Sequence, residues 1–520
     1  MASKVNSALY DLIQSLSKSE KRYFKVLSSR HTIGDENTYV RLFDYIDQMS
    51  SYDEDQLFEN FKGEAFLNRF SITKKRLYDN ILNALDAYYA ERSENAQLYK
   101  MLHAAEILFN KSLYDQARRQ LVSAEKQAKK SDNEYILVLI NEQKKRLIET
   151  VGYATVDQEE IERIVETTDE VLHQVSFHNK LWFIKSELFK RLLTRGLARN
   201  AEDVKEYTRI CSPVFDEFSL KALNNNSAYL INHIRSVYYY ALGDLEQSYE
   251  YLRKNLEFYT SMVEFQKREP EKYISVLTNA VYIADRLGRH TEALKLLGAL
   301  KRVSLDQDLN ENLKIKVFST YQSIQLSLEL RMGNLVDAKK LIPEIEGGFF
   351  EFGEKINPTR TAFLSYKIAV LYLITGEYGE ALKWLNKVLN EPELDVNEDL
   401  VAYAHLLELI VYIEQGKEDL LKYKLKNTER YFRKRKRLHT TEKMMIDFIQ
   451  SWSRSEDRFD RIDLIEKLSC SLEEINLTNQ SESLVMDYFD LISWCESKKS
   501  GRSLSDCIRD RYNAHIRNAS

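Results

Sequence analysis

Proline, glycine and cysteine are scarce in this sequence. Its 520 residues include 5 Pro, 15 Gly and 4 Cys. Because proline and glycine interrupt helices, their scarcity predicts long helices joined by short turns. The cysteines lie far apart and form no Cys-x-x-Cys pair, which disfavours a zinc site and predicts buried thiols in a reducing compartment; they are Cys211, Cys470, Cys495 and Cys507.

Long hydrophobic segments and a strong net charge are also missing. The longest apolar runs, such as residues 135–140, are too short to cross a bilayer, and the N-terminal sequence has no apolar segment of signal-peptide length. The net charge of −5 gives no global attraction to nucleic acid or to a membrane surface. These features predict a cytoplasmic protein that does not insert into membranes.

The common catalytic motifs do not occur in the sequence. It contains no Gly-x-Ser-x-Gly elbow, no Gly-x-x-x-x-Gly-Lys phosphate loop, no His-Glu-x-x-His and no Gly-x-Gly-x-x-Gly. The histidines are dispersed, and the five-residue spacing of His173 and His178 puts them on different faces of a helix. We therefore expect no enzymatic activity, no cofactor and no bound metal.

One short pattern recurs along the chain. A turn residue is followed by acidic or polar residues and then by a small residue; the turns lie at Ser112, Gly243, Gly288, Gly333, Gly376 and Gly416. The last five turn residues are 45, 45, 43 and 40 positions apart. Apolar residues spaced three and four apart flank each turn, and glycine permits the positive φ that ends a helix. Each repeat is predicted to be a helical hairpin.

This pattern resembles the tetratricopeptide repeat. Its small, aromatic and turn positions match Ala369, Tyr372, Gly376, Tyr378, Ala381, Leu385 and Val388, with Pro392 near the closing proline. The period is longer than the standard 34 residues, so the closer likeness is to long-repeat members, which include cytoplasmic peptide-sensing regulators. The resemblance covers roughly residues 96–440 and implies an all-α solenoid of about six to eight antiparallel helical hairpins.

The two ends of the chain lie outside the clear repeats. Residues 1–95 are predicted to form a helical domain, in which Ser17 and Glu20 make a capping box. Residues 441–520 are predicted to form a helical cap over the last repeat, with another capping box at Ser471 and Glu474. The aromatic and glycine-rich residues 347–353 are predicted to form a loop that either protrudes or folds back between repeats.

The first helix of each hairpin lines the concave surface of such a solenoid, which is the default place for a protein or peptide ligand. Amide and phenol groups there can bind an extended peptide; the candidates are Asn232, Tyr240, Asn279, Tyr282 and Tyr366. The alternative is that the aromatic residues pack between repeats and the asparagines are solvated. The Lys and Asn array of a chaperone-tail clamp is not present at the matching positions, so that ligand is disfavoured.

Two basic segments leave a nucleic-acid-associated, transcriptional regulator as the alternative function. Residues 422–443 hold ten Lys or Arg against two Glu, and Arg430, Arg433 and Arg437 lie on one helix face. At Lys74, Lys75 and Arg76 a helix could resemble the recognition helix of a helix-turn-helix, with Thr73 also facing outward. However, residues 1–92 contain 13 basic and 14 acidic residues, and a solvated helix face also explains residues 422–443.

Overall fold

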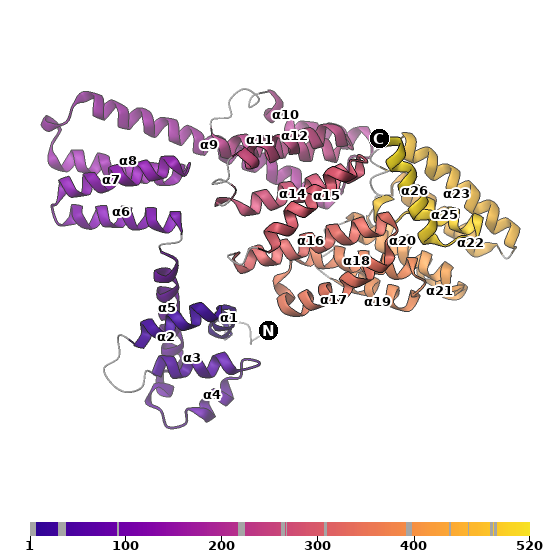
Figure 1. The fold of residues 1–520 in the computed structure, drawn as a ribbon, viewed down its shortest axis with the longest axis horizontal. Coiled ribbons are helices and arrows are strands. Elements are labelled where there is room, and N and C mark those ends of the chain that lie inside the picture. Colours follow the sequence, from indigo (N-terminus) through magenta and orange to yellow (C-terminus); the bar gives the residue numbers. More distant parts are fainter. Residues whose placement is uncertain are drawn as a thin grey trace. The chain divides into compact units, whose positions relative to one another are not determined.

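A computed structural model describes residues 7–29, 38–90, 93–216, 224–261, 266, 268–305, 309–391, 398–435, 438–455, 457–478, 482 and 486–519. Within these ranges every regular element is a helix and none is a strand (Figure 1). The chain divides into two compact units, Met1–Ser176 and Phe177–Ser520. The predicted boundary at residues 95 and 96 lies inside the first of them.

The first unit begins with a small helical cluster. Its elements are α1 (Ala8–Ser15), α2 (Lys18–Ser29), α3 (Thr38–Gln48), α4 (Glu54–Asn60), the 3-10 helix η1 (Ala65–Arg69) and α5 (Phe70–Tyr89). Its core contains Ile13, Phe24 and Phe43, none of them more than 1% exposed. The capping box of α2 is confirmed, because the Glu20 side chain accepts from the Ser17 amide at 2.6 Å and the Glu20 amide donates to Ser17 Oγ at 3.3 Å.

Longer helices complete the first unit. They are α6 (Glu94–Asn110), α7 (Tyr114–Lys130), α8 (Glu134–Val151), the 3-10 helix η2 (Tyr153–Thr155) and the first part of α9 (Gln158–Arg195). The turns between α6, α7 and α8 use positive φ at Ser112, 60°, and Asp132, 48°. Alanines at positions 117, 124 and 128 of α7 are buried, which lets the neighbouring helices pack closely.

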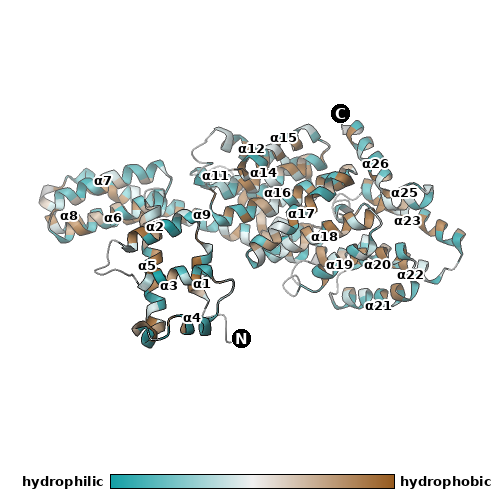
Figure 2. Ribbon diagram, turned by 60° about the horizontal axis from the view of Figure 1, so that its bottom comes forward, coloured by the Kyte–Doolittle hydropathy of each residue, from teal (hydrophilic) through white to brown (hydrophobic). Residues whose placement is uncertain are grey.

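The second unit is a stack of helical hairpins. After the end of α9 come α10 (Ala201–Asp216), α11 (Asn225–Ala241), α12 (Leu245–Ser261), α14 (Pro270–Arg286), α15 (His290–Ser304), α16 (Glu311–Met332), α17 (Leu335–Phe352), η3 (Gly353–Lys355), α18 (Pro358–Ile374), α19 (Tyr378–Leu389), α20 (Glu398–Gln415) and α21 (Glu418–Arg435). From α11 onward consecutive helices pair, and the first helices of successive hairpins also touch. Hydrophobic residues gather where these helices meet (Figure 2). The predicted all-α solenoid of antiparallel hairpins is confirmed.

The turns of the hairpins follow one geometry. At Gly333 φ is 70°, and the next amide, that of Asn334, donates to the carbonyl of Glu329 at 2.9 Å. This six-residue backbone loop is the Schellman motif, in which a left-handed residue closes the helix end. The same bond from the residue after the turn recurs after Gly243, Gly288, Gly376 and Gly416, and after Ser112 in the first unit. The predicted turns are therefore confirmed at all six positions.

Residues 347–353 do not form the predicted loop. Helix α17 continues to Phe352, and Gly347 and Gly348 lie inside it. Gly348 faces the ring of Phe318 so closely that an added Cβ would lie 2.0 Å from the Phe318 Cζ atom. The glycine is thus used for close packing between helices, which is why a breaker signal in the sequence gave the wrong prediction.

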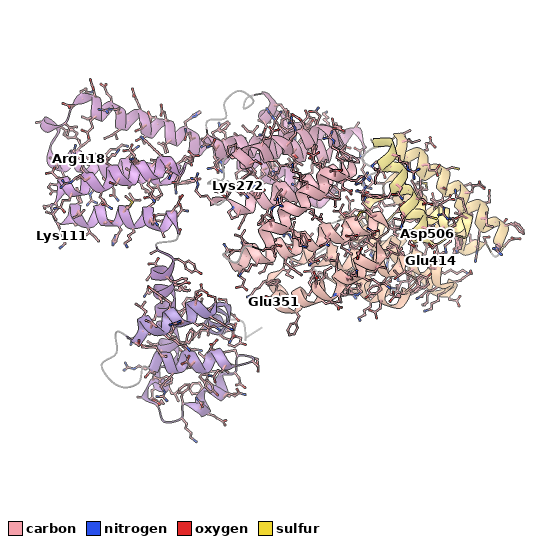
Figure 3. All side chains as sticks on the ribbon, viewed as in Figure 1. Lys111, Arg118, Lys272, Glu351, Glu414 and Asp506 are labelled. Carbon is pink, nitrogen blue, oxygen red and sulfur yellow. The ribbon has the colours of Figure 1, made fainter. Side chains whose placement is uncertain are left out.

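In the described part of the chain, four α-helices follow the last hairpin. They are α22 (Thr440–Arg454), α23 (Arg458–Thr478), α25 (Leu491–Ser500) and α26 (Leu504–Ala519), with the 3-10 helix η5 (Met486–Tyr488) before α25. The predicted capping box at Ser471 is wrong, because that residue lies in the middle of α23. The Glu414 side chain of α20, labelled in Figure 3, accepts hydrogen bonds from Trp494 Nε1 at 2.7 Å and Lys498 Nζ at 2.6 Å. Helix α25 therefore packs on α20 of the last hairpin, whereas α26 reaches back to α16 and to the turns at Gly333 and His290.

Two smaller expectations can be compared with the structure. Three of the four cysteines are buried, whereas Cys470 is exposed, so the prediction of buried thiols is wrong for that residue. None of the helices in the described ranges combines the length and apolar character that a membrane span requires.

Candidate functional site

A cavity of about 410 Å³ lies inside the second unit. Its walls come from the end of α9 and the residues just after it, from α11, α12, α14, α16 and α18, from Asp399 of α20, and from η5. Most of the wall is apolar; the larger apolar side chains are Phe189, Leu192, Leu197, Val237, Ile324 and Phe363. Cavities of this size and character hold small ligands or single side chains.

Small hydroxyl side chains leave the space that forms the cavity. Ser323 and Ser327 are four residues apart on α16, so they lie on the same face of that helix, and Ser236 and Thr278 contribute from α11 and α14. In the sequence, the signal was this pair of serines spaced by four, with Arg331 one turn further on the same face and the apolar Ile324 and Leu328 next to them.

Three of the five predicted peptide-binding residues line this cavity: Tyr240, Asn279 and Tyr282. Asn279 has no hydrogen-bond partner among the described residues, so its amide is available to a ligand. Burial raises the pKa of Tyr240 to about 12 and that of Tyr282 well above its usual value, so both phenols stay neutral near pH 7.

The other two predicted residues are placed differently. The Asn232 amide donates to Asn255 Oδ1 at 3.1 Å, which ties α11 to α12. Tyr366 has no exposed surface, and its ring meets that of Tyr488 edge-on with centroids 5.7 Å apart. Neither side chain reaches the cavity wall, because one bonds within its hairpin and the other packs in the core.

Each carboxylate of the cavity wall is paired with an arginine. Asp285 pairs with Arg331, and its other oxygen, Oδ1, lies 3.0 Å from Nδ1 of the His290 ring. Asp487 pairs with Arg286 at 2.7 Å. The third wall carboxylate, that of Asp399, pairs with Arg199 at 2.8 Å. These carboxylates are compensated, so the wall presents no isolated negative charge.

Lys367 of α18 is the exception among the charged groups of the wall. Its side chain is buried, with 7% of the residue exposed, and its ammonium donates to the main-chain carbonyl of Asp487 at 2.8 Å. Among the described residues it has no carboxylate ion-pair partner. Burial lowers the pKa of Lys367 to about 8, so the amine is still mostly protonated at pH 7.

A short piece of the chain itself occupies one end of the site. The Asp487 carboxylate accepts hydrogen bonds from the Tyr282 hydroxyl at 2.9 Å and from Arg286 at 2.7 Å. The ring of the following residue, Tyr488, stacks on Tyr403 of α20, with centroids 4.9 Å apart and planes 8° from parallel. The first helices of the hairpins therefore hold an acidic and an aromatic residue through both side-chain and main-chain contacts. Sequence reasoning missed these residues because they lie far along the chain from their partners.

The basic residues predicted on α5 are only partly available. Lys74 donates to Tyr52 Oη at 3.1 Å and to Glu54 at 3.2 Å, whereas Lys75 and Arg76 are exposed. The outward position expected for Thr73 is wrong, because it is 8% exposed and its hydroxyl donates to the carbonyl of Arg69 at 3.3 Å. The buried stripe of α5 therefore includes Thr73, one turn before Leu77, and is longer than the sequence pattern indicated.

The basic face predicted on α21 is exposed. Lys422, Lys426, Arg430 and Arg433 lie on the surface, spaced by four, four and three residues. None of these four forms an ion pair with another described residue, and Arg430 donates only to Asn427 at 3.1 Å. Arg437 lies outside the described residues.

In the part of the chain that the structure describes, no three His, Cys, Asp or Glu side chains are grouped so that they could hold a metal ion. Comparison with known protein-family models gives no match, and comparison with curated protein sequences gives none either.

Proposed function

We propose that this chain is a non-enzymatic scaffold, adaptor or ligand-responsive regulator that binds a protein segment or peptide at the cavity of its second unit. One observation carries the proposal: the first helices of the hairpins already hold residues 487 and 488 of the same chain as they would hold a bound peptide. Beside that segment the cavity remains open, with the Asn279 amide and the Tyr240 and Tyr282 rings in its wall. The tetratricopeptide-like pattern of the sequence supports the same function.

The chemistry of the wall supports binding better than catalysis. Its carboxylates are held by arginines, its tyrosines are neutral near pH 7, and the Lys367 amine, with a pKa of about 8, is mostly protonated at pH 7 and donates to a main-chain carbonyl, so none of these groups is a free base. A general base would need a free carboxylate or a weakly acidic group aimed at a substrate. The proposed location is the cytoplasm, which the unpaired cysteines support.

Filling the cavity should weaken peptide binding. In a selection of displayed peptides on the full-length protein, we expect the recovered peptides to bind the Ser327→Phe variant at least about tenfold more weakly, since a phenyl ring would occupy the space left by the serine. The control is Ser304→Phe, the same substitution at an exposed position of α15. Affinities would be measured by fluorescence anisotropy. Equal binding to wild type and to Ser327→Phe would exclude the cavity as the peptide site.

A second candidate function, nucleic-acid association, is favoured by the exposed basic face of α21. Four phosphate contacts predict that the logarithm of the binding constant for duplex DNA falls with the logarithm of salt concentration with a slope of about −3 to −4. Lys426→Glu combined with Arg430→Glu should remove this binding, whereas Lys301→Glu with Arg302→Glu, two exposed cations of α15, should change it little. Titrations of labelled single-stranded and duplex DNA from low to physiological salt test this; no binding at low salt would eliminate the candidate.

A further inference from the structure

The wall of the second unit's cavity is mostly apolar, and it holds one buried cation that forms no ion pair with a carboxylate of the described residues. We infer that the ligand of this cavity combines an apolar group with a single carboxylate, and that the carboxylate binds the Lys367 ammonium. The inference rests on the proposed function only in taking this cavity as the ligand site; it adds the chemistry of the ligand. The carboxylate could belong to a peptide or to a free acyl chain, and the experiment below separates these two sources.

The apolar part of the ligand follows from the wall. Leucine, isoleucine, valine and phenylalanine side chains surround the open volume of about 410 Å³, and the hydroxyls of Thr278 and Ser236 are turned to carbonyl or hydroxyl partners within the protein. Thr278 Oγ1 donates to the carbonyl of Ile274 at 2.6 Å. An aliphatic or aromatic ligand group placed there would leave water and contact apolar side chains, which favours its binding.

The anionic part follows from the distribution of charge. Of the cations close to the cavity, Arg331 is paired with Asp285, Arg286 with Asp487 and Arg199 with Asp399, whereas the Lys367 ammonium forms no ion pair with any residue that the structure describes. Burial is the main cause of the lowered pKa of Lys367. Two charged groups face the amine from other elements: Asp487 of η5 raises this pKa, and Arg331 of α16 lowers it. Both of these neighbours are engaged with partners of opposite charge, so the unmatched charge at this point is positive.

Only 7% of the Lys367 residue is exposed, and burying a protonated amine costs free energy unless an anion compensates its charge. The amine donates a hydrogen bond to the Asp487 carbonyl at 2.8 Å and lies over the ring of Phe363, 5.3 Å from its centroid. An ammonium can donate three hydrogen bonds, so it can keep the carbonyl and still bind a carboxylate. The Asn279 amide, which also lines the cavity without a described partner, can donate to the same ligand.

The test uses the full-length protein and two pairs of probes that differ in the carboxylate alone. Decanoate is compared with 1-decanol, and a short peptide ending in leucine with a free carboxylate is compared with its C-terminal amide. Binding is followed by isothermal titration. We expect the acid of at least one pair to bind about ten- to a hundredfold more tightly than its neutral counterpart, the range of a charge-assisted hydrogen bond.

Lys367→Met should remove this preference while the neutral probe still binds, because methionine keeps the apolar volume and lacks the charge. The matched control is Lys316→Met: Lys316 of α16 also donates to a main-chain carbonyl, that of Glu271 at 2.9 Å, but does not line the cavity. This control should keep the preference for the acid. Retained binding of 1-decanol or of the peptide amide by Lys367→Met establishes that the cavity is still folded.

The outcomes separate the inference from the proposed function. Equal affinity for acid and neutral probes, or an acid preference that survives in Lys367→Met, would overturn the inference while peptide binding could stand. Binding of decanoate without either peptide would support the inference for a free acyl carboxylate and would count against the peptide function. If no probe of either pair binds the wild-type protein, the inference is wrong.

Discussion

Replacing Arg199 with methionine is expected to lower the free energy of unfolding of the second unit by about 3–5 kcal/mol. The Arg199 side chain is 1% exposed and donates to Asp399 Oδ1 at 2.8 Å and to Glu442 Oε1 at 2.6 Å. It therefore joins the segment between α9 and α10 to Asp399 of α20 and Glu442 of α22, which lie 200 and 243 residues further along the chain. Methionine would fill similar space but would leave two poorly exposed carboxylates without their cation.

The effect of Arg199→Met should depend on pH. Burial raises the pKa of Glu442 and Arg199 opposes that rise, so removal of the arginine raises the pKa of Glu442 further. A carboxyl group whose pKa is higher in the folded than in the unfolded state destabilises the fold fully above the folded pKa. This penalty disappears as the pH falls below the unfolded value of about 4.3. The loss of stability in the variant should accordingly be larger at pH 8 than at pH 5.

Urea unfolding followed by tryptophan fluorescence measures this change in the second unit alone, since Trp182, Trp384, Trp452 and Trp494 all lie there. The matched control is Arg209→Met. Arg209 is 62% exposed in its side chain and pairs with Glu206 three residues earlier, so its replacement should leave the unfolding curve unchanged. Similar curves for the two variants would show that the buried ion pairs of Arg199 do not hold these helices together.

Adjacent glycines of α17 are expected to respond in opposite ways to the same substitution. Gly348→Ala should destabilise the second unit by about 1–3 kcal/mol, because the new methyl group would overlap the Phe318 ring, with Cβ only 2.0 Å from Cζ. Gly347→Ala meets no atom within 4 Å and should stabilise it by about 0.5–1 kcal/mol, since alanine favours a helix over glycine. The two positions differ only in which side of the helix they face.

One side of the half-buried Phe318 ring is already occupied. It already contacts the ring of Phe352, one turn along α17, with centroids 5.4 Å apart. Urea unfolding of both alanine variants and of the double variant would measure the two effects, which should add if the sites are independent. Stabilisation by Gly348→Ala would mean that the ring swings away freely and that the glycine is not needed for packing.

The hairpins could be predicted because their signal is local. A glycine such as Gly376 occurs where the backbone must be left-handed, and apolar residues three and four apart mark the helices on both sides. The same local reasoning failed at Gly348, because glycine gives the same signal whether it ends a helix or allows a close contact. It failed at Ser471 for a similar reason, since a serine followed by glutamates also fits an exposed helix interior.

The candidate site could be predicted only in part. Placing the binding surface on the first helix of each hairpin led to Tyr240, Asn279 and Tyr282, which do line the cavity. Asp487 and the unmatched charge of Lys367 could not be found that way, because their roles depend on contacts made by residues more than a hundred positions apart. Local periodicity carries no information on such contacts.

The hydrogen bonds that Asp487 accepts from Arg286 and Tyr282 span 201 and 205 residues, so they also have a consequence for synthesis in the cell. At about 5–20 residues per second, the ribosome needs roughly 10–40 s to translate the stretch between them. During that interval the hairpins can form one after another, but the cavity that they surround still lacks the part of its wall formed by Asp487 and Tyr488. The nascent chain therefore has a defined window in which a chaperone, or an early-arriving ligand, can protect that surface from aggregation.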